Sequence, residues 1–110
     1  MNEFLRQAYG DPCRTCGYGW SAGVDVCRET IQAAPDRFEE LLVGRNGREV
    51  RRGLDWNTAS YVIHLADVLR IWADRVASAA LGSSGAIVPY DEGQLGLVRG
   101  YVDLPLPGGL

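Results

Sequence analysis

The stretch NTASYVIHLADVLRIWADRVASAAL, residues 57–81, decides the fold class of this sequence. Asn57 or Thr58 suits an N-cap, and no glycine or proline follows until Gly82. Apolar side chains recur at alternating spacings of four and three residues, which predicts a single helix with one buried stripe. The predicted stripe consists of Tyr61, Leu65, Val68, Trp72, Val76 and Ala79.

A second helical pattern precedes this helix, from Ser21 as the candidate N-cap to Gly44 as the candidate C-terminal stop. Pro35 interrupts the segment, so we expect a kink or a short break there. Its apolar stripe consists of Val24, Cys27, Ile31, Ala34, Phe38 and Leu41. The two helices, joined by a loop of about a dozen residues, predict an antiparallel hairpin in an all-α protein.

The helical signal weakens after Gly82. The sequence predicts a linker, a short helix that starts near Asp91, and an irregular tail, because DLPLPGGL contains many helix breakers. We expect a single domain with an N-terminal segment (1–19), a hairpin (20–82) and a short helix with tail (83–110). The core of such a domain is thin. We therefore expect a second copy or a missing segment to cover the two stripes.

The composition is that of an ordinary globular protein of 110 residues, with 46% hydrophobic and 23% charged side chains. No apolar run approaches the roughly 18 residues that would span a bilayer, and the N-terminus lacks the pattern of a secretion signal. We therefore expect a cytoplasmic protein whose three cysteines stay reduced. The net charge of −3 argues against nonspecific binding to nucleic acids.

Three motifs resemble those of a known family: DWNTASYVIHLADVLRIWADRV (55–76), CRTCGYGW (13–20) and PYDEGQLGLVRGYVDLP (89–105). They are similar to segments of the DinB-like superfamily (YfiT-like, maleylpyruvate isomerase N-terminal), in particular of an actinobacterial branch that begins with CxxCG. The resemblance implies an up-down-down-up four-helix bundle with a metal site. In that family one histidine of the second helix and two ligands of the last helix usually bind the metal.

Applied to this chain, the resemblance makes His64 the metal ligand of the second helix. His64 is the only histidine, and the sequence stops where the later helices of the family run. We therefore expect a truncated member of the family, in which the other two family ligands have no counterpart. A homodimer would complete its bundle.

The thiol pair Cys13 and Cys16 allows three interpretations: a zinc site, a redox dithiol or two inert thiols. A CxxC turn followed by glycine lets two thiolates converge on one ion. A redox dithiol usually begins a helix, whereas Pro12 and Gly17 flank this pair. We therefore favour zinc. The predicted ligands are Cys13, Cys16, His64 and Asp67.

The fourth coordination position has further candidates, which are Asp91, Glu92 and a water molecule. Asp67 could instead orient the imidazole of His64, a role that carboxylates often take beside a metal. Cys27 lies on the apolar stripe of the first helix, and free cysteine behaves as a small apolar residue. We therefore expect Cys27 in the core.

These features predict two functions of different classes. The first is a small zinc-binding DinB-like protein with metal-dependent thiol or hydrolytic chemistry, for which the sequence names no reaction. The alternative is a non-catalytic dimeric interaction or structural module stapled by a Cys/His zinc site. Four protein ligands favour the staple, whereas three ligands and a water favour chemistry. A redox dithiol protein is a third option, which ordinary thiol pKa values at Cys13 and Cys16 would exclude.

Overall fold

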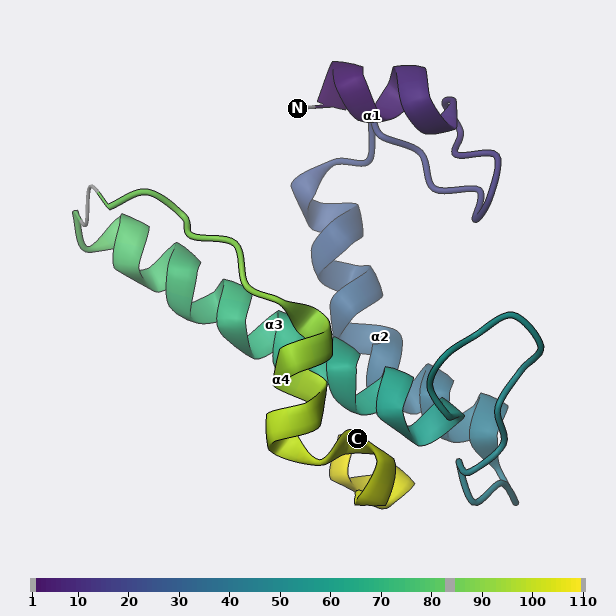
Figure 1. Ribbon diagram of the computed structural model, residues 1–110. Coiled ribbons are helices and arrows are strands. Elements are labelled where there is room, and N and C mark those ends of the chain that lie inside the picture. Colours follow the sequence, from purple (N-terminus) through teal and green to yellow (C-terminus); the bar gives the residue numbers. More distant parts are fainter. Residues whose placement is uncertain (1, 83–84, 110) are drawn as a thin grey trace. The chain divides into compact units, whose positions relative to one another are not determined.

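The computed structural model describes residues 2–82 and 85–109 of the chain. These residues form four α-helices and two 3₁₀ turns (Figure 1). The elements are α1 (Asn2–Tyr9), α2 (Val24–Leu42), α3 (Thr58–Ala80), α4 (Glu92–Arg99), η1 (Tyr101–Asp103) and η2 (Leu106–Gly109). In the part of the chain that the structure describes, extended pairing is limited to one bridge between Val50 and Asn57. The prediction of an all-α protein is confirmed.

Two compact units divide the chain, an N-terminal unit (Met1–Arg37) and a C-terminal unit (Phe38–Leu110). The N-terminal unit contains α1 and most of α2, and the C-terminal unit contains the last turn of α2 and everything after it. Over the described ranges 2–82 and 85–109, none of the helices combines the length and the apolar character needed to cross a membrane.

The boundaries of α3 and α4 follow from their caps. Asn57 accepts a hydrogen bond from the backbone N–H of Ser60 at 2.8 Å and so begins α3 at the predicted position. Asp91 accepts one from Gln94 at 2.9 Å and begins α4. The predicted helix that starts near Asp91 is therefore confirmed. Helix α4 ends at Gly100, whose φ of 66° is the left-handed conformation that glycine adopts at low cost.

The N-terminal helices differ from the prediction. Helix α2 begins at Val24 rather than beside Ser21, and it continues through Pro35 as one helix. Helix α1 lies in the segment 1–19, for which the sequence predicts no helix. No residue of α2 is fully buried, and of the apolar stripe predicted there Cys27, Ala34 and Phe38 are half-buried whereas Val24, Ile31 and Leu41 are exposed.

The buried face of α3 is not the predicted one. The buried residues of α3 are Ala59, Ser60, Val62, Ile63 and Asp67. Because an α-helix turns by about 100° per residue, Ala59 and Ile63 lie on the side opposite to Tyr61 and Leu65. The prediction of a buried stripe through Tyr61 and Leu65 was therefore wrong for this chain.

The elements that cover α3 explain the difference. Helix α3 packs against η1, η2 and α4, all of which follow it in the sequence. The core of the C-terminal unit consists of Ala59, Val62 and Leu106, with Phe38 and Leu42 packed against it. At Gly109 a Cβ atom would lie 2.8 Å from the backbone nitrogen of Ile63, so η2 touches the backbone of α3. The segment predicted as an irregular tail thus forms one wall of the core.

A glycine in the loop between α2 and α3 closely approaches both α3 and η2. Gly47 is buried with a φ of 78°, and its carbonyl accepts a hydrogen bond from Ala59 N–H at 2.8 Å. A Cβ atom at Gly47 would lie 2.8 Å from the Cβ of Ala59. Only glycine meets both the backbone conformation and the close approach.

Candidate functional site

The thiol pair lies in a run of tight turns that follows α1. Cys13 accepts a hydrogen bond on its backbone carbonyl from Gly17 N–H and donates its own N–H to the carbonyl of Tyr18, each at 2.8 Å. Cys13 is buried and Cys16 is exposed, and both are free thiols. The CxxC therefore lies in turns that follow a helix, which is not the helix start that a redox dithiol usually occupies.

Backbone hydrogen bonds lower the pKa of the Cys13 thiol below its ordinary value. The backbone groups of Cys16 and Thr15 hydrogen-bond to Cys13 and lower the pKa of its thiol, and they outweigh the opposing effect of burial. Hydrogen bonds that favour the charged form stabilise a thiolate, which is the form that binds metal and attacks electrophiles. Ordinary thiol pKa values would have argued against a redox dithiol. Because the pKa of Cys13 is lowered, the redox interpretation stays open beside zinc.

Trp20 holds this turn closed. Its indole Nε1–H donates to the carbonyl of Gly10 at 2.7 Å, and its backbone N–H donates to Asp11 Oδ1 at 3.3 Å. Arg6 contacts the other oxygen of Asp11 at 3.4 Å. The ring of Tyr18 packs edge-on against Trp20, with 5.1 Å between ring centroids. The aromatic residues of the CRTCGYGW motif thus fix the backbone that positions Cys13.

The third cysteine is separate from the pair. Cys27 is half-buried on α2, where we predicted a core position. Its thiol hydrogen-bonds with the hydroxyl of Tyr18, and this contact together with the charge of Cys27 raises the pKa of Tyr18. Cys27 therefore lies at the boundary between the interior and solvent.

Asp67 on α3 is the centre of a buried ionic cluster. It is 2% exposed, and its Oδ2 accepts a hydrogen bond from the hydroxyl of Tyr101 at 2.6 Å. Arg99 Nε contacts the same oxygen at 2.7 Å, and Arg70 Nη2 contacts Oδ1 at 2.6 Å. Burial raises the pKa of Tyr101 first, and the hydrogen bond to Asp67 raises it further. A buried carboxylate is tolerated here because two guanidinium groups and a phenol surround it.

The sequence did not predict this cluster, although it contained a signal. Arg70 follows Asp67 by three residues, the spacing at which charges meet on one helix face. Arg99 and Tyr101 belong to the RGY motif, which we had noted only as a mark of family resemblance. The segments 55–76 and 89–105 therefore meet at one carboxylate.

His64 lies beside this cluster without bonding to it. Its ring packs against Trp56, with 5.3 Å between centroids, and lies 6.5 Å from the ring of Tyr101. Its Nδ1 atom is buried and has no hydrogen-bond partner within the described residues. Asp67 contacts Tyr101, Arg70 and Arg99. None of these contacts is with the imidazole of His64, which Asp67 was predicted to orient.

The predicted metal ligands fall in different units. Cys13 and Cys16 lie in the N-terminal unit, whereas His64 and Asp67 lie in the C-terminal unit. In the ranges that the structure describes, no group of three or more His, Cys, Asp or Glu side chains is arranged to hold a metal ion. Asp91, a further candidate, acts as the N-cap of α4. The thiol turn thus contains two of the predicted ligands, and His64, in the C-terminal unit, has a buried Nδ1 atom without a partner among the described residues.

Comparison with known proteins finds no family model, no curated protein and no solved structure that matches this chain.

Proposed function

We propose that this chain is a small zinc-binding helical protein of the DinB-like kind, in which Cys13 and Cys16 bind the metal. The observation that supports the proposal is the thiol turn, where backbone hydrogen bonds from Cys16 and Thr15 favour the thiolate of Cys13. Zinc prefers thiolate ligands, and a CxxC turn lets two sulfur atoms bind the same ion. A zinc ion bound there would supply Lewis acidity or a structural staple, according to its remaining ligands.

His64 stays a prediction from the sequence as the third ligand, because it lies in the C-terminal unit and the thiol pair lies in the N-terminal unit. Its buried Nδ1 has no partner in the described part of the chain, and neutral imidazole is a frequent zinc ligand. Asp67 receives no metal bond in this proposal, because both of its oxygens already contact a guanidinium or phenol group. A water molecule or another carboxylate would complete the sphere. We place the protein in the cytoplasm, where thiols stay reduced and available to zinc.

Elemental analysis tests the metal. The tag-free protein is purified as wild type, as Cys13→Ser/Cys16→Ser, as His64→Ala and as Cys27→Ser. We expect near-stoichiometric zinc in the wild type and in Cys27→Ser, and loss of zinc in the double cysteine variant. Loss in His64→Ala as well would identify the third ligand, whereas retention would leave the thiol pair with other ligands. A wild type without zinc, even after refolding with zinc present, would refute the proposal.

A second candidate function is a dimeric interaction module, and exposed apolar side chains on α3 favour it. Trp72 is 44% exposed and Val76 is 65% exposed, and both lie on the predicted stripe. A second copy of the chain could cover this face, as a C2 dimer would. The charge change Val76→Glu should then convert a dimer to a monomer in sedimentation experiments. Ala77→Glu is the control, because Ala77 is also exposed and lies about 100° further round the helix. A monomeric wild type at high concentration would refute this candidate.

A further inference from the structure

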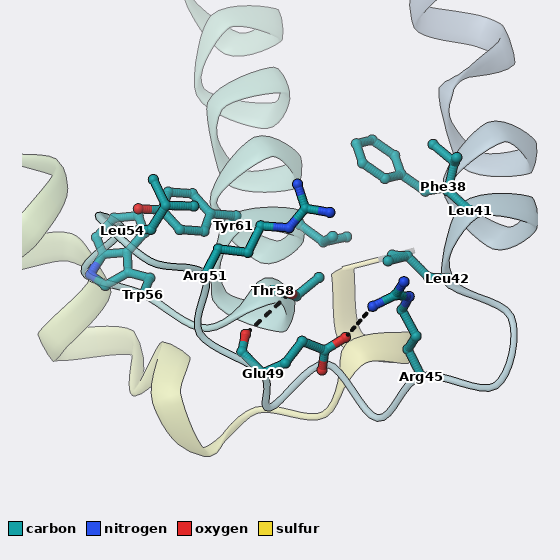
Figure 2. Close-up of a pocket in the computed structure, with 11 residues that line it drawn as sticks. Phe38, Leu41, Leu42, Arg45, Glu49, Arg51, Leu54, Trp56, Thr58 and Tyr61 are labelled. Carbon is teal, nitrogen blue, oxygen red and sulfur yellow. Dashed lines mark hydrogen bonds and ion pairs between the residues drawn. The ribbon is translucent and has the colours of Figure 1, made fainter.

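A pocket in the C-terminal unit lies apart from the thiol turn. It opens between the last turn of α2, the loop that leads to α3, and the first turn of α3 (Figure 2). Its volume is about 440 Å³, which lies within the range of pockets that bind small molecules. All of its lining residues belong to the C-terminal unit.

Apolar side chains form most of the pocket wall. They are Phe38, Leu41, Leu42, Leu54, Trp56, Tyr61 and Val62. Leu41 is 59% exposed and Leu54 is 45% exposed, so part of this apolar surface faces solvent in the unliganded chain. Two aromatic rings, Trp56 and Tyr61, pack against each other with 5.3 Å between centroids. The wall therefore suits a flat apolar group, whose burial here would remove apolar surface from water.

Positive charge exceeds negative charge among the side chains that line the pocket. Arg45 pairs with Glu49 at 3.5 Å, so these two side chains largely neutralise each other. Arg51 also lines the pocket, and Figure 2 shows its guanidinium group extending across the space in front of Tyr61. Among the described residues Arg51 makes no ion pair and no side-chain hydrogen bond. The pocket thus combines an apolar wall with one uncompensated positive charge.

We propose that this pocket binds a small apolar carboxylic acid of about two fused rings in size, with its carboxylate on Arg51. A guanidinium group matches the geometry of a carboxylate and binds it through two parallel hydrogen bonds. A phosphorylated or multiply charged ligand fits poorly, because one uncompensated cation faces seven apolar side chains. A neutral apolar ligand would leave the guanidinium group of Arg51 without a negatively charged partner. This proposal does not depend on zinc, since the thiol turn contributes no residue to the pocket.

Isothermal titration calorimetry with 2-naphthoate and its neutral analogue 2-naphthamide tests the proposal. We expect the full-length wild type to bind 2-naphthoate at least about tenfold more tightly than 2-naphthamide, because a charged hydrogen bond is lost with the amide. Added salt should weaken the binding of 2-naphthoate and leave that of 2-naphthamide nearly unchanged. Equal affinities for the two probes, or no binding of 2-naphthoate at millimolar concentration, would overturn the proposal.

Matched variants locate the site. Arg51→Gln should weaken 2-naphthoate binding about tenfold, whereas Arg52→Gln, its neighbour in the loop that does not line the pocket, should not. Leu54→Ala should weaken both probes, whereas Val50→Ala, exposed in the same loop, should weaken neither. Circular dichroism establishes that each variant is folded. Equal losses in Arg51→Gln and Arg52→Gln would overturn the assignment of Arg51, and unchanged binding in Cys13→Ser/Cys16→Ser would separate this site from the zinc proposal.

Discussion

Tyr101 donates its phenolic hydrogen to Oδ2 of Asp67 at 2.6 Å, across 34 positions of sequence. This contact connects the turn after α4 to the middle of α3 inside the C-terminal unit. Arg99 reaches the same carboxylate oxygen at 2.7 Å. The acid, the phenol and the two arginines therefore form one cluster centred on Asp67, and loss of Asp67 leaves the other three without this partner.

The first prediction concerns the charge of Asp67. Asp67→Asn keeps the size of the side chain but replaces one carboxylate oxygen with an amide that faces a cation. We expect the free energy of unfolding to fall by about 2 kcal/mol, which is the value of a hydrogen bond to a charged group. The loss stays this small because Arg70 and Arg99 are partly exposed to water. Urea denaturation followed by circular dichroism measures it. Asp74→Asn, exposed on the same helix, should change stability by less than about 0.5 kcal/mol.

The second prediction concerns pH. Burial and the hydrogen bond to Asp67 raise the pKa of Tyr101 well above its ordinary value. The unfolded chain loses this proton near pH 10, whereas the folded chain retains it, so above about pH 10 the unfolded state binds fewer protons. The stabilisation is complete below that pH and declines as the pH rises.

Tyr101→Phe removes this titration. Urea denaturation between about pH 9 and about pH 11 should show a shallower loss of stability in the variant than in the wild type. The difference between the two slopes is the informative quantity, because the two proteins share every other ionisable group. Identical slopes would contradict a raised pKa for Tyr101.

The third prediction separates backbone strain from crowding at two glycines. Gly47 and Gly53 have similar positive φ values, 78° and 83°. A Cβ atom at Gly47 would lie 2.8 Å from Ala59 Cβ, whereas at Gly53 it would meet nothing within 4 Å. We expect Gly47→Ala to lower the free energy of unfolding by about 1–3 kcal/mol more than Gly53→Ala does. Equal losses would mean that the loop moves away from α3 at little cost.

The fourth prediction concerns the support of the thiol turn. Trp20→Phe removes the 2.7 Å hydrogen bond to the carbonyl of Gly10 while keeping an aromatic ring. If the turn binds zinc, its metal affinity should fall by about 1 kcal/mol, the net value of one hydrogen bond. Competition with a chromophoric chelator measures this affinity. Trp72→Phe, in the C-terminal unit, should have no effect, and an equal loss in both variants would contradict the role of Trp20.

Local signals in the sequence predicted local structure well. Asn57 and Asp91 were expected to begin helices, and their side chains do accept the predicted hydrogen bonds. The burial of α3 could not be predicted in the same way, because periodicity reports which side of a helix is apolar but not what covers it. The cover comes from Leu106. Leu106 lies in a stretch with prolines and glycines, which shows no helical periodicity in the sequence.

The ionic cluster escaped prediction for a related reason. Asp67 was predicted as a metal ligand or as a partner of His64, and nothing within one helical turn except Arg70 indicates that it is the centre of a buried ionic cluster. Its other partners, Arg99 and Tyr101, are distant in sequence, so only the folded chain brings them together. The zinc ligands, the DinB-like relationship and the dimer stay predictions that the experiments above address.

The position of the RGY turn has a consequence for how the protein is made. Synthesis proceeds from the N-terminus, so α3 is made before Arg99, Tyr101 and Leu106. Until these residues are free to fold, Asp67 has only Arg70 among its partners, and the face of α3 around Ile63 lacks its cover from η2. The C-terminal unit therefore completes its core only after the residues that follow α4 are made, and a ribosome that stalls soon after α3 would present a helix without its cover to chaperones and proteases.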